Sequence, residues 1–129
     1  MADTKTTSSK AKRVLIIEDE RPLAHALELK LMSSGYETAI ATTGAEGIKE
    51  AQAQPYDLIL LDLIIPGVDG FGVLRELKTK KVTTPVIVLS NLGQAEDQER
   101  AKELGVREYF VKSNTPLAVI VDTIRKFLK

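Results

Sequence analysis

Residues 14–19 read Val-Leu-Ile-Ile-Glu-Asp, and residues 58–62 read Leu-Ile-Leu-Leu-Asp. In both stretches four consecutive apolar residues lead into a carboxylate. Apolar side chains at successive positions indicate a strand that is buried on both faces, as in a parallel sheet covered by helices. If the two runs form neighbouring parallel strands, then Glu18, Asp19 and Asp62 meet at one edge of that sheet. Such a cluster repels itself unless a cation lies in it, and its oxygen ligands suit Mg2+.

The same pattern recurs along the chain. Further apolar runs occupy residues 86–89 and 109–111, and a weaker run covers residues 38–41. Between these runs the apolar residues take helical spacing, so strand and helix alternate five times. This alternation predicts an α/β fold with a doubly wound, five-stranded parallel sheet and helices on both faces. A closed barrel would need about eight such units, which is more than the chain contains.

Residues at the ends of the predicted helices support this division. Gly35 follows the first helix and Gly105 follows the fourth, as expected for residues that end helices. Thr43 is predicted to cap the second helix, and Thr115-Pro116 to begin the fifth as cap and first helical residue. The fifth helix has an apolar face made of Leu117, Ile120, Val121, Ile124, Phe127 and Leu128.

Composition narrows the class of protein. A chain of 129 residues has room for one domain of ordinary size. Lys plus Arg and Asp plus Glu both total 18, so the net charge indicates no general affinity for nucleic acid or anionic membranes. Cysteine is absent and His25 is the single histidine, which excludes disulfides and zinc sites built from thiolates or several histidines.

The composition also predicts how the chain is organised. Residues 1–12 are expected to form a flexible N-terminal tail, and residues 13–129 a single domain. The longest apolar runs fall far short of the roughly 20 residues that span a bilayer, so we expect a cytoplasmic protein.

From residue 13 to residue 129 the sequence resembles the receiver domain of two-component response regulators, and it is similar to chemotaxis-type single-domain receivers. The resemblance rests on motifs in the family's order: the acidic pair Glu18-Asp19, the segment 62–70 (Asp-Leu-Ile-Ile-Pro-Gly-Val-Asp-Gly), the hydroxyl of Ser90, and Tyr109 and Lys112 at the last strand. It implies the flavodoxin-like strand order 2-1-3-4-5, in which the ligand site lies between the first and third strands.

The resemblance implies a role in a phosphorelay. Asp62 would accept a phosphoryl group from a sensor histidine kinase or a phosphotransfer protein, with Mg2+ as cofactor. Lys112 and Ser90 would bind phosphoryl oxygens, and the ring of Tyr109 would rotate when Ser90 moves. The metal ligands would be Glu18, Asp19, Asp62 and the backbone carbonyl of Ile64. The protein would be a stoichiometric phosphoacceptor that promotes its own phosphorylation and dephosphorylation, and not an enzyme.

The expected output is a change in the surface formed by helix 4, strand 5 and helix 5, which would control a downstream partner protein. The fourth helix, over residues 94–104, has few apolar anchors beyond Ala95, Ala101 and Leu104, so weak anchoring would let it shift. A monomer or a phosphorylation-dependent dimer is expected, without direct contact to nucleic acid or membrane. Ile64 and Leu92 flank the path of an attacking water, and because both are apolar we expect slow self-dephosphorylation.

Three positions depart from the family pattern. Lys112 is followed by Ser113, where the family usually has a proline after a cis bond, so we expect either a trans bond with a shifted loop or a strained cis bond. Asn91 stands where a small alanine is typical, and would narrow access to the phosphoryl group. Ile65 replaces a common methionine, with little chemical consequence.

Two other functions stay open. A degenerate receiver would act as a phosphorylation-independent protein-interaction module, although such a module has no need for a repulsive carboxylate cluster. A flavodoxin-like cofactor carrier would need a phosphate-binding loop after the first strand, where this chain has Glu18-Asp19-Glu20. Taken singly, each site residue has a plainer explanation, such as a capping turn or a surface lysine. Their joint placement at strand ends favours the receiver.

Overall fold

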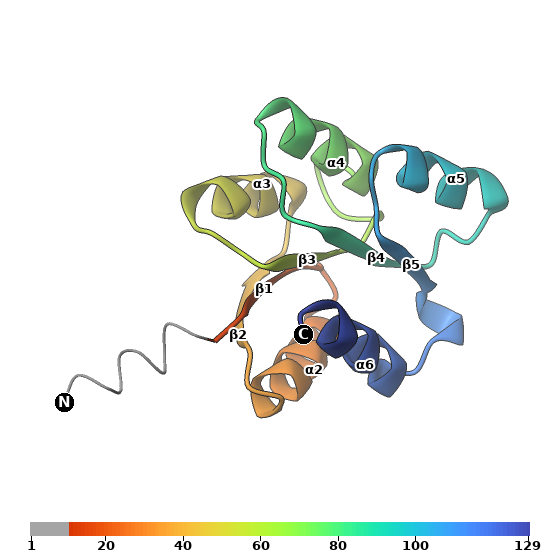
Figure 1. Cartoon of the computed structure of the whole chain (residues 1–129). Coiled ribbons are helices and arrows are strands. Elements are labelled where there is room, and N and C mark those ends of the chain that lie inside the picture. Colours follow the sequence, from red (N-terminus) through yellow and green to blue (C-terminus); the bar gives the residue numbers. More distant parts are fainter. Residues whose placement is uncertain (1–10) are drawn as a thin grey trace.

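The computed structural model describes residues 11–129, which form a five-stranded parallel sheet with helices on both faces (Figure 1). The strand order is β2-β1-β3-β4-β5 and every neighbouring pair is parallel, which confirms the predicted topology. The strands are β1 (Arg13–Ile17), β2 (Glu37–Ala41), β3 (Leu58–Leu61), β4 (Val86–Ser90) and β5 (Glu108–Val111). The helices are α2 (Arg21–Ser33), α3 (Gly44–Ala53), α4 (Gly70–Thr79), α5 (Ala95–Glu103), the short 3-10 helix η1 (Lys112–Asn114) and α6 (Leu117–Phe127).

The sheet separates two apolar cores. Helices α2 and α6 cover one face, and α3, α4 and α5 cover the other (Figure 1). Successive side chains of a strand point to opposite faces. Val14 and Ile16 of β1 therefore pack in the core under α2 and α6, while Leu15 and Ile17 pack in the core under α3 and α4. Burial on both sides explains why the central strands consist of consecutive apolar residues.

Local capping sets where several helices begin and end. The hydroxyl of Thr43 accepts a hydrogen bond from the backbone N–H of Glu46 at 3.1 Å, which confirms the predicted cap of α3. The carboxylate of Asp69 accepts one from the N–H of Gly72 at 2.8 Å at the start of α4. Gly35 has a φ of 96° after α2, a left-handed conformation that glycine adopts without strain.

Two predictions about the helices are wrong: the residues that begin α6, and the role of Ala95 as an apolar anchor of α5. Thr115 does not cap α6, because its hydroxyl donates to the carbonyl of Val111 at 2.8 Å and so belongs to the turn around η1. Pro116 is the residue before the helix, which begins at Leu117. Ala95 is exposed at the first position of α5 and anchors nothing. Within α5 only Ala101 is buried, so this helix is held even more weakly than its sequence predicts.

A close backbone approach fixes the segment that follows β3. A Cβ atom at Gly70 would lie 2.4 Å from the Cα atom of Leu63, a separation that real side chains do not show. The backbone N–H of Gly70 also donates to the carbonyl of Leu63 at 3.0 Å. The start of α4 is thereby packed directly onto the residue after Asp62.

Residues 1–10, most of the predicted N-terminal tail, lie outside the described residues. Over residues 11–129, no helix has both the length and the apolar character that crossing a bilayer requires.

Candidate functional site

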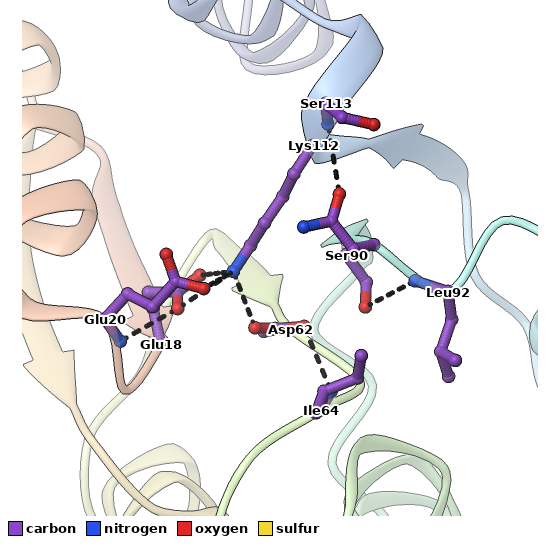
Figure 2. Close-up of polar contacts among 9 residues, drawn as sticks. Glu18, Glu20, Asp62, Ile64, Ser90, Leu92, Lys112 and Ser113 are labelled. Atoms are coloured by element: carbon purple, nitrogen blue, oxygen red, sulfur yellow. Dashed lines mark hydrogen bonds and ion pairs between the residues drawn. The ribbon is translucent and has the colours of Figure 1, made fainter.

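Three charged side chains meet at the carboxyl ends of three strands (Figure 2). Glu18 follows β1, Asp62 follows β3 and Lys112 follows β5. The backbone continues the sheet at the first two positions, since Glu18 N–H donates to the carbonyl of Ala41 at 2.9 Å and Asp62 N–H to that of Ile17 at 3.0 Å. Both carboxylates are buried, with 2 % and 3 % of their residue surface exposed.

Lys112 is the centre of this cluster. Its Nζ lies 2.8 Å from Oδ2 of Asp62, 3.0 Å from Oε1 of Glu18 and 3.0 Å from Oε2 of Glu20. In the close-up, the lysine side chain extends from the end of β5 toward the two acidic segments (Figure 2). One ammonium thus pairs with three carboxylates, which leaves the cluster with an excess of negative charge when all four groups are ionised.

Backbone amides hold the carboxylates in place. Oδ1 of Asp62 accepts a hydrogen bond from the N–H of Ile64 at 3.0 Å, and Oε2 of Glu18 accepts one from the N–H of Glu20 at 3.0 Å. Among the described residues, every buried side-chain nitrogen and oxygen has a hydrogen-bond partner. Asp62 therefore presents one oxygen to the lysine and the other to the turn that follows it.

Burial and charge shift the pKa values of this cluster. Burial is the main cause that raises the pKa of Glu18 to about 7; the N–H of Glu20 opposes the rise, the charge of Asp62 adds to it, and Lys112 opposes it. Burial alone would lower the pKa of Lys112, but its hydrogen bonds to Asp62, Glu20 and Glu18 outweigh burial and hold that pKa above its ordinary value. Lys112 is accordingly charged at neutral pH, and an additional cation would favour the ionised form of Glu18.

A second group of predicted residues comes from β4, which ends at Ser90, and from β5, which contains Tyr109. Ser90 is fully buried, and its Oγ accepts a hydrogen bond from the N–H of Leu92 at 3.4 Å. The hydroxyl of Tyr109 donates to the carbonyl of the same Leu92. Burial, with smaller effects of Asp97 and Asp62, raises the pKa of Tyr109 to about 12. The tyrosine hydroxyl therefore keeps its proton and continues to donate at neutral pH.

The site contains one acidic residue that the sequence analysis did not assign to it. Carboxylate oxygens of Glu18, Glu20 and Asp62 lie within 4.8 Å of one another, whereas Asp19 is exposed and is not part of this group. The signal for Glu20 was present in the sequence, since it is the third acid of the run 18–20. Carboxylate oxygens are the ligands that Mg2+ prefers, and in this structure the ammonium of Lys112 lies between the three acids. All four predicted metal ligands, Glu18, Asp19, Asp62 and the carbonyl of Ile64, stay predictions.

The peptide bond after Lys112 is trans, which excludes the strained cis bond that was the other expectation. The described residues contain no cis peptide bond, so the bond from Lys112 to Ser113 is trans. Lys112, Ser113 and Asn114 form η1. The N–H of Ser113 donates to Oδ1 of Asn91 at 3.1 Å.

Comparison with known proteins identifies the family. The sequence profile of the response regulator receiver domain matches residues 14–125. The chain belongs to the response regulator receiver domain family. The receiver is 40 % identical over 100 residues, or 78 % of its length, to the cell cycle response regulator CtrA of Brucella ovis and of Brucella abortus. It spans 43 % of the length of these relatives.

Solved structures agree with this assignment. The receiver domain of the Francisella response regulator 1452 superposes on this receiver with a TM-score of 0.85 at 26 % identity, covering 91 % of this chain and 96 % of that one. The signal receiver domain of a histidine kinase from Syntrophus aciditrophicus gives 0.81 at 30 %, covering 92 % and 90 %. The receiver domain of sensor histidine kinase PA1611 from Pseudomonas aeruginosa, which has a magnesium ion in its active-site cleft, gives 0.81 at 25 %, covering 92 % and 98 %.

Proposed function

We propose that this receiver, over residues 13–129, accepts a phosphoryl group on Asp62 from a histidine kinase or a phosphotransfer protein. The observation that carries the proposal is the 2.8 Å contact between Nζ of Lys112 and Oδ2 of Asp62, two nearly buried side chains at the ends of different strands. A buried carboxylate beside a fixed ammonium suits a reaction in which negative charge arrives at one of its oxygens.

The reaction is a displacement at phosphorus. A carboxylate oxygen of Asp62 attacks the phosphorus of a phosphohistidine, the bond from phosphorus to the imidazole nitrogen breaks, and the histidine leaves with that electron pair. The new bond makes an acyl phosphate. Lys112, which pairs with Asp62 before transfer, pairs with a phosphoryl oxygen afterwards, and the hydroxyl of Ser90 donates to another. Phosphoryl transfer needs mainly positioning and charge cancellation, which these groups supply.

A divalent cation would complete this arrangement. Glu18, Glu20 and Asp62 would hold Mg2+, joined by Asp19 and the carbonyl of Ile64 if the sequence prediction holds. Such a cation would supply positive charge that stabilises the phosphoryl oxygens. Support comes from the oxygen donor set of this chain and from the magnesium ion in the cleft of the PA1611 receiver domain.

We further propose that phosphorylation of Asp62 changes the positions of Tyr109 and α5, and that a partner protein recognises this change. Tyr109 donates to the carbonyl of Leu92 in the loop that follows Ser90, and it helps to line a groove with Gln98 and Lys102 of α5. A movement of Ser90 toward a phosphoryl oxygen would displace the loop that contains Leu92, and with it the partner of the Tyr109 hydroxyl. Since α5 has one buried residue, a small bias suffices to shift it and to change the α5, β5 and α6 surface seen by a partner protein.

A titration with beryllofluoride, an analogue of a phosphoryl group, tests this proposal. The 15N amide signals of Ser90, Leu92 and Tyr109 should shift on addition of beryllofluoride with Mg2+, and Asp62→Asn should abolish the shifts. If beryllofluoride binds but the signals of α5 and β5 do not change, the proposed movement of Tyr109 and α5 is contradicted, while the proposed phosphoryl transfer to Asp62 is not. Absence of any binding would favour the degenerate receiver that binds partners without phosphorylation.

A further inference from the structure

Beyond the last paired residues of β4 and β5, one side chain joins the two segments that leave the sheet. The parallel register ends at the pair Ser90 and Val111. After this pair the chains diverge, one toward α5 on one face of the sheet and the other through η1 toward α6 on the opposite face (Figure 1). Oδ1 of Asn91 accepts a hydrogen bond from the backbone N–H of Ser113 at 3.1 Å across this gap.

The two bonded residues are sequence neighbours of two site residues. Asn91 directly follows Ser90, and Ser113 directly follows Lys112. The loop after β4 also lies against the end of β5, because a Cβ atom at Gly93 would be 3.6 Å from the side chain of Val111. The Asn91 carboxamide is therefore placed to control the distance between the hydroxyl and the ammonium of the site.

Two other hydrogen bonds near the site each lie within one of these segments. A short turn follows Lys112, in which the N–H of Thr115 donates a hydrogen bond to the carbonyl of Lys112 at 3.4 Å. Ser90 is tied to its own loop by the 3.4 Å bond from Leu92 N–H. Both contacts act within one segment, whereas the bond from Ser113 to Asn91 joins the two. Tyr109 also joins them, through the carbonyl of Leu92, but it does so from within β5 and three residues before Lys112.

We propose that Asn91 is a positioning residue for phosphoryl transfer: its carboxamide ties the segment of Ser90 to the turn of Lys112, so that both groups meet the phosphoryl oxygens in a fixed arrangement. The inference rests on the proposed function, since it concerns the transfer to Asp62. It assigns Asn91 a role through its hydrogen bond, in contrast to the steric role expected from its size. Asn91 and Ser113 are both exposed, so the loss of their bond leaves the two buried cores intact.

Three variants separate the hydrogen bond from the size of the side chain. Asn91→Leu keeps the size and removes the acceptor, and Asn91→Ala removes both. Ser113→Ala is the matched control, because it alters the partner residue but keeps its backbone N–H. The rate of Asp62 phosphorylation is measured with phosphoramidate and Mg2+ over a range of donor concentrations.

If the bond positions the site, Asn91→Leu and Asn91→Ala both lower the maximal rate by about three- to tenfold, the kinetic equivalent of one ordinary hydrogen bond. The donor concentration at half-maximal rate stays unchanged, and Ser113→Ala behaves as wild type. A faster reaction of Asn91→Ala together with an unchanged rate of Asn91→Leu would overturn the inference, since Asn91 would then act by narrowing access. Unchanged rates in both variants would overturn it as well.

A second measurement does not depend on phosphorylation. The ammonium protons of Lys112, whose side chain is 9 % exposed, are followed by 15N NMR in the metal-free protein. Their exchange with water should be several-fold faster in Asn91→Leu than in wild type, and Asn91→Asp, which keeps the acceptor, should restore slow exchange. Equal exchange in Asn91→Leu and wild type would overturn the inference. If wild type forms no phosphoryl adduct, the proposed function fails, and this exchange measurement alone decides whether Asn91 positions Lys112.

Discussion

Lys112 Nζ lies 2.8 Å from Oδ2 of Asp62, although 50 residues separate the two in the sequence. Strand β4 lies between β3, which Asp62 follows, and β5, which Lys112 follows. The lysine side chain therefore reaches across the end of β4, past Ser90, to meet the carboxylate. This geometry puts the ammonium where it can contact both a phosphoryl group on Asp62 and the acids that would hold a cation.

Replacing the lysine tests how much of the cluster depends on it. Lys112→Met leaves Glu18 and Asp62 buried without their cation, and removal of one partner from a buried ion pair costs about 3–5 kcal/mol. We expect the free energy of unfolding in urea at pH 8 to fall by about 3 kcal/mol without metal. Added Mg2+ should recover a large part of this loss, because it supplies the missing positive charge.

The control for Lys112→Met is Lys80→Met. The ammonium of Lys80 lies 3.8 Å from Glu76 on the surface, where an ion pair contributes about 0–1 kcal/mol. Lys80→Met should change the unfolding free energy little and its Mg2+ dependence not at all. Equal losses in the two variants would show that the buried cluster does not depend on Lys112.

Gly70 is expected to be intolerant of any side chain. In Gly70→Ala the new methyl group would lie 2.4 Å from the Cα atom of Leu63, so the segment that carries Asp62 must move. Overpacking of this kind costs about 1–3 kcal/mol. Gly93→Ala is the control, because its methyl group would meet nothing closer than 3.6 Å. Thermal unfolding of both variants checks the difference, and similar midpoints would contradict the packing at Gly70.

Self-dephosphorylation should be slow because apolar side chains flank Asp62, the proposed acceptor. Ile64 is 53 % exposed beside Asp62, and neither it nor Leu92 can orient a water. Polar replacements, Ile64→Asn or Leu92→Glu, should shorten the phosphoryl half-life by on the order of tenfold through general-base or hydrogen-bonding assistance. The half-life is followed by intact mass, with Val119→Asn as a surface control on α6. A half-life shortened by neither replacement would count against this account.

Two tyrosines should contribute to a loss of stability at alkaline pH. Burial, aided by Glu50, raises the pKa of Tyr56 to about 12, and burial, aided by Asp97, raises that of Tyr109 to about 12 from an ordinary 10. The folded protein binds these protons more tightly than the unfolded chain. Their stabilising effect is therefore complete below pH 10 and is lost as the pH rises to 12. The double variant Tyr56→Phe, Tyr109→Phe should show a flatter decline of the melting temperature between pH 9 and pH 12, and an equally steep decline would refute the effect.

Much of the fold follows from the sequence for a simple physical reason. Strands β1, β3 and β4 each contain four consecutive apolar residues that are buried, as is typical of strands covered on both faces. The alternation with helices then implies a parallel sheet. The strand order depended on the resemblance to receivers, because periodicity does not determine which strands are neighbours.

The sequence predicted the site residues whose positions depend on the strands that precede them. It did not predict the contacts that depend on side chains in the turns. Glu18 and Asp62 were placed by the strands that precede them. Glu20 reaches Lys112 because the turn folds back on Glu18, and Thr115 is diverted from capping α6 by the carbonyl of Val111. These contacts depend on distances between atoms in turns, about which apolar spacing carries no information.

The most direct test of the account is intact-mass spectrometry after incubation with phosphoramidate and Mg2+. Wild type should gain a single phosphoryl group, and the adduct should be absent from Asp62→Asn and from wild type treated with a metal chelator. Asp57→Asn, which alters another aspartate in the same stretch, should still form the adduct. No adduct on wild type, or an adduct that persists in Asp62→Asn, would contradict the assignment of Asp62 as the phosphoacceptor.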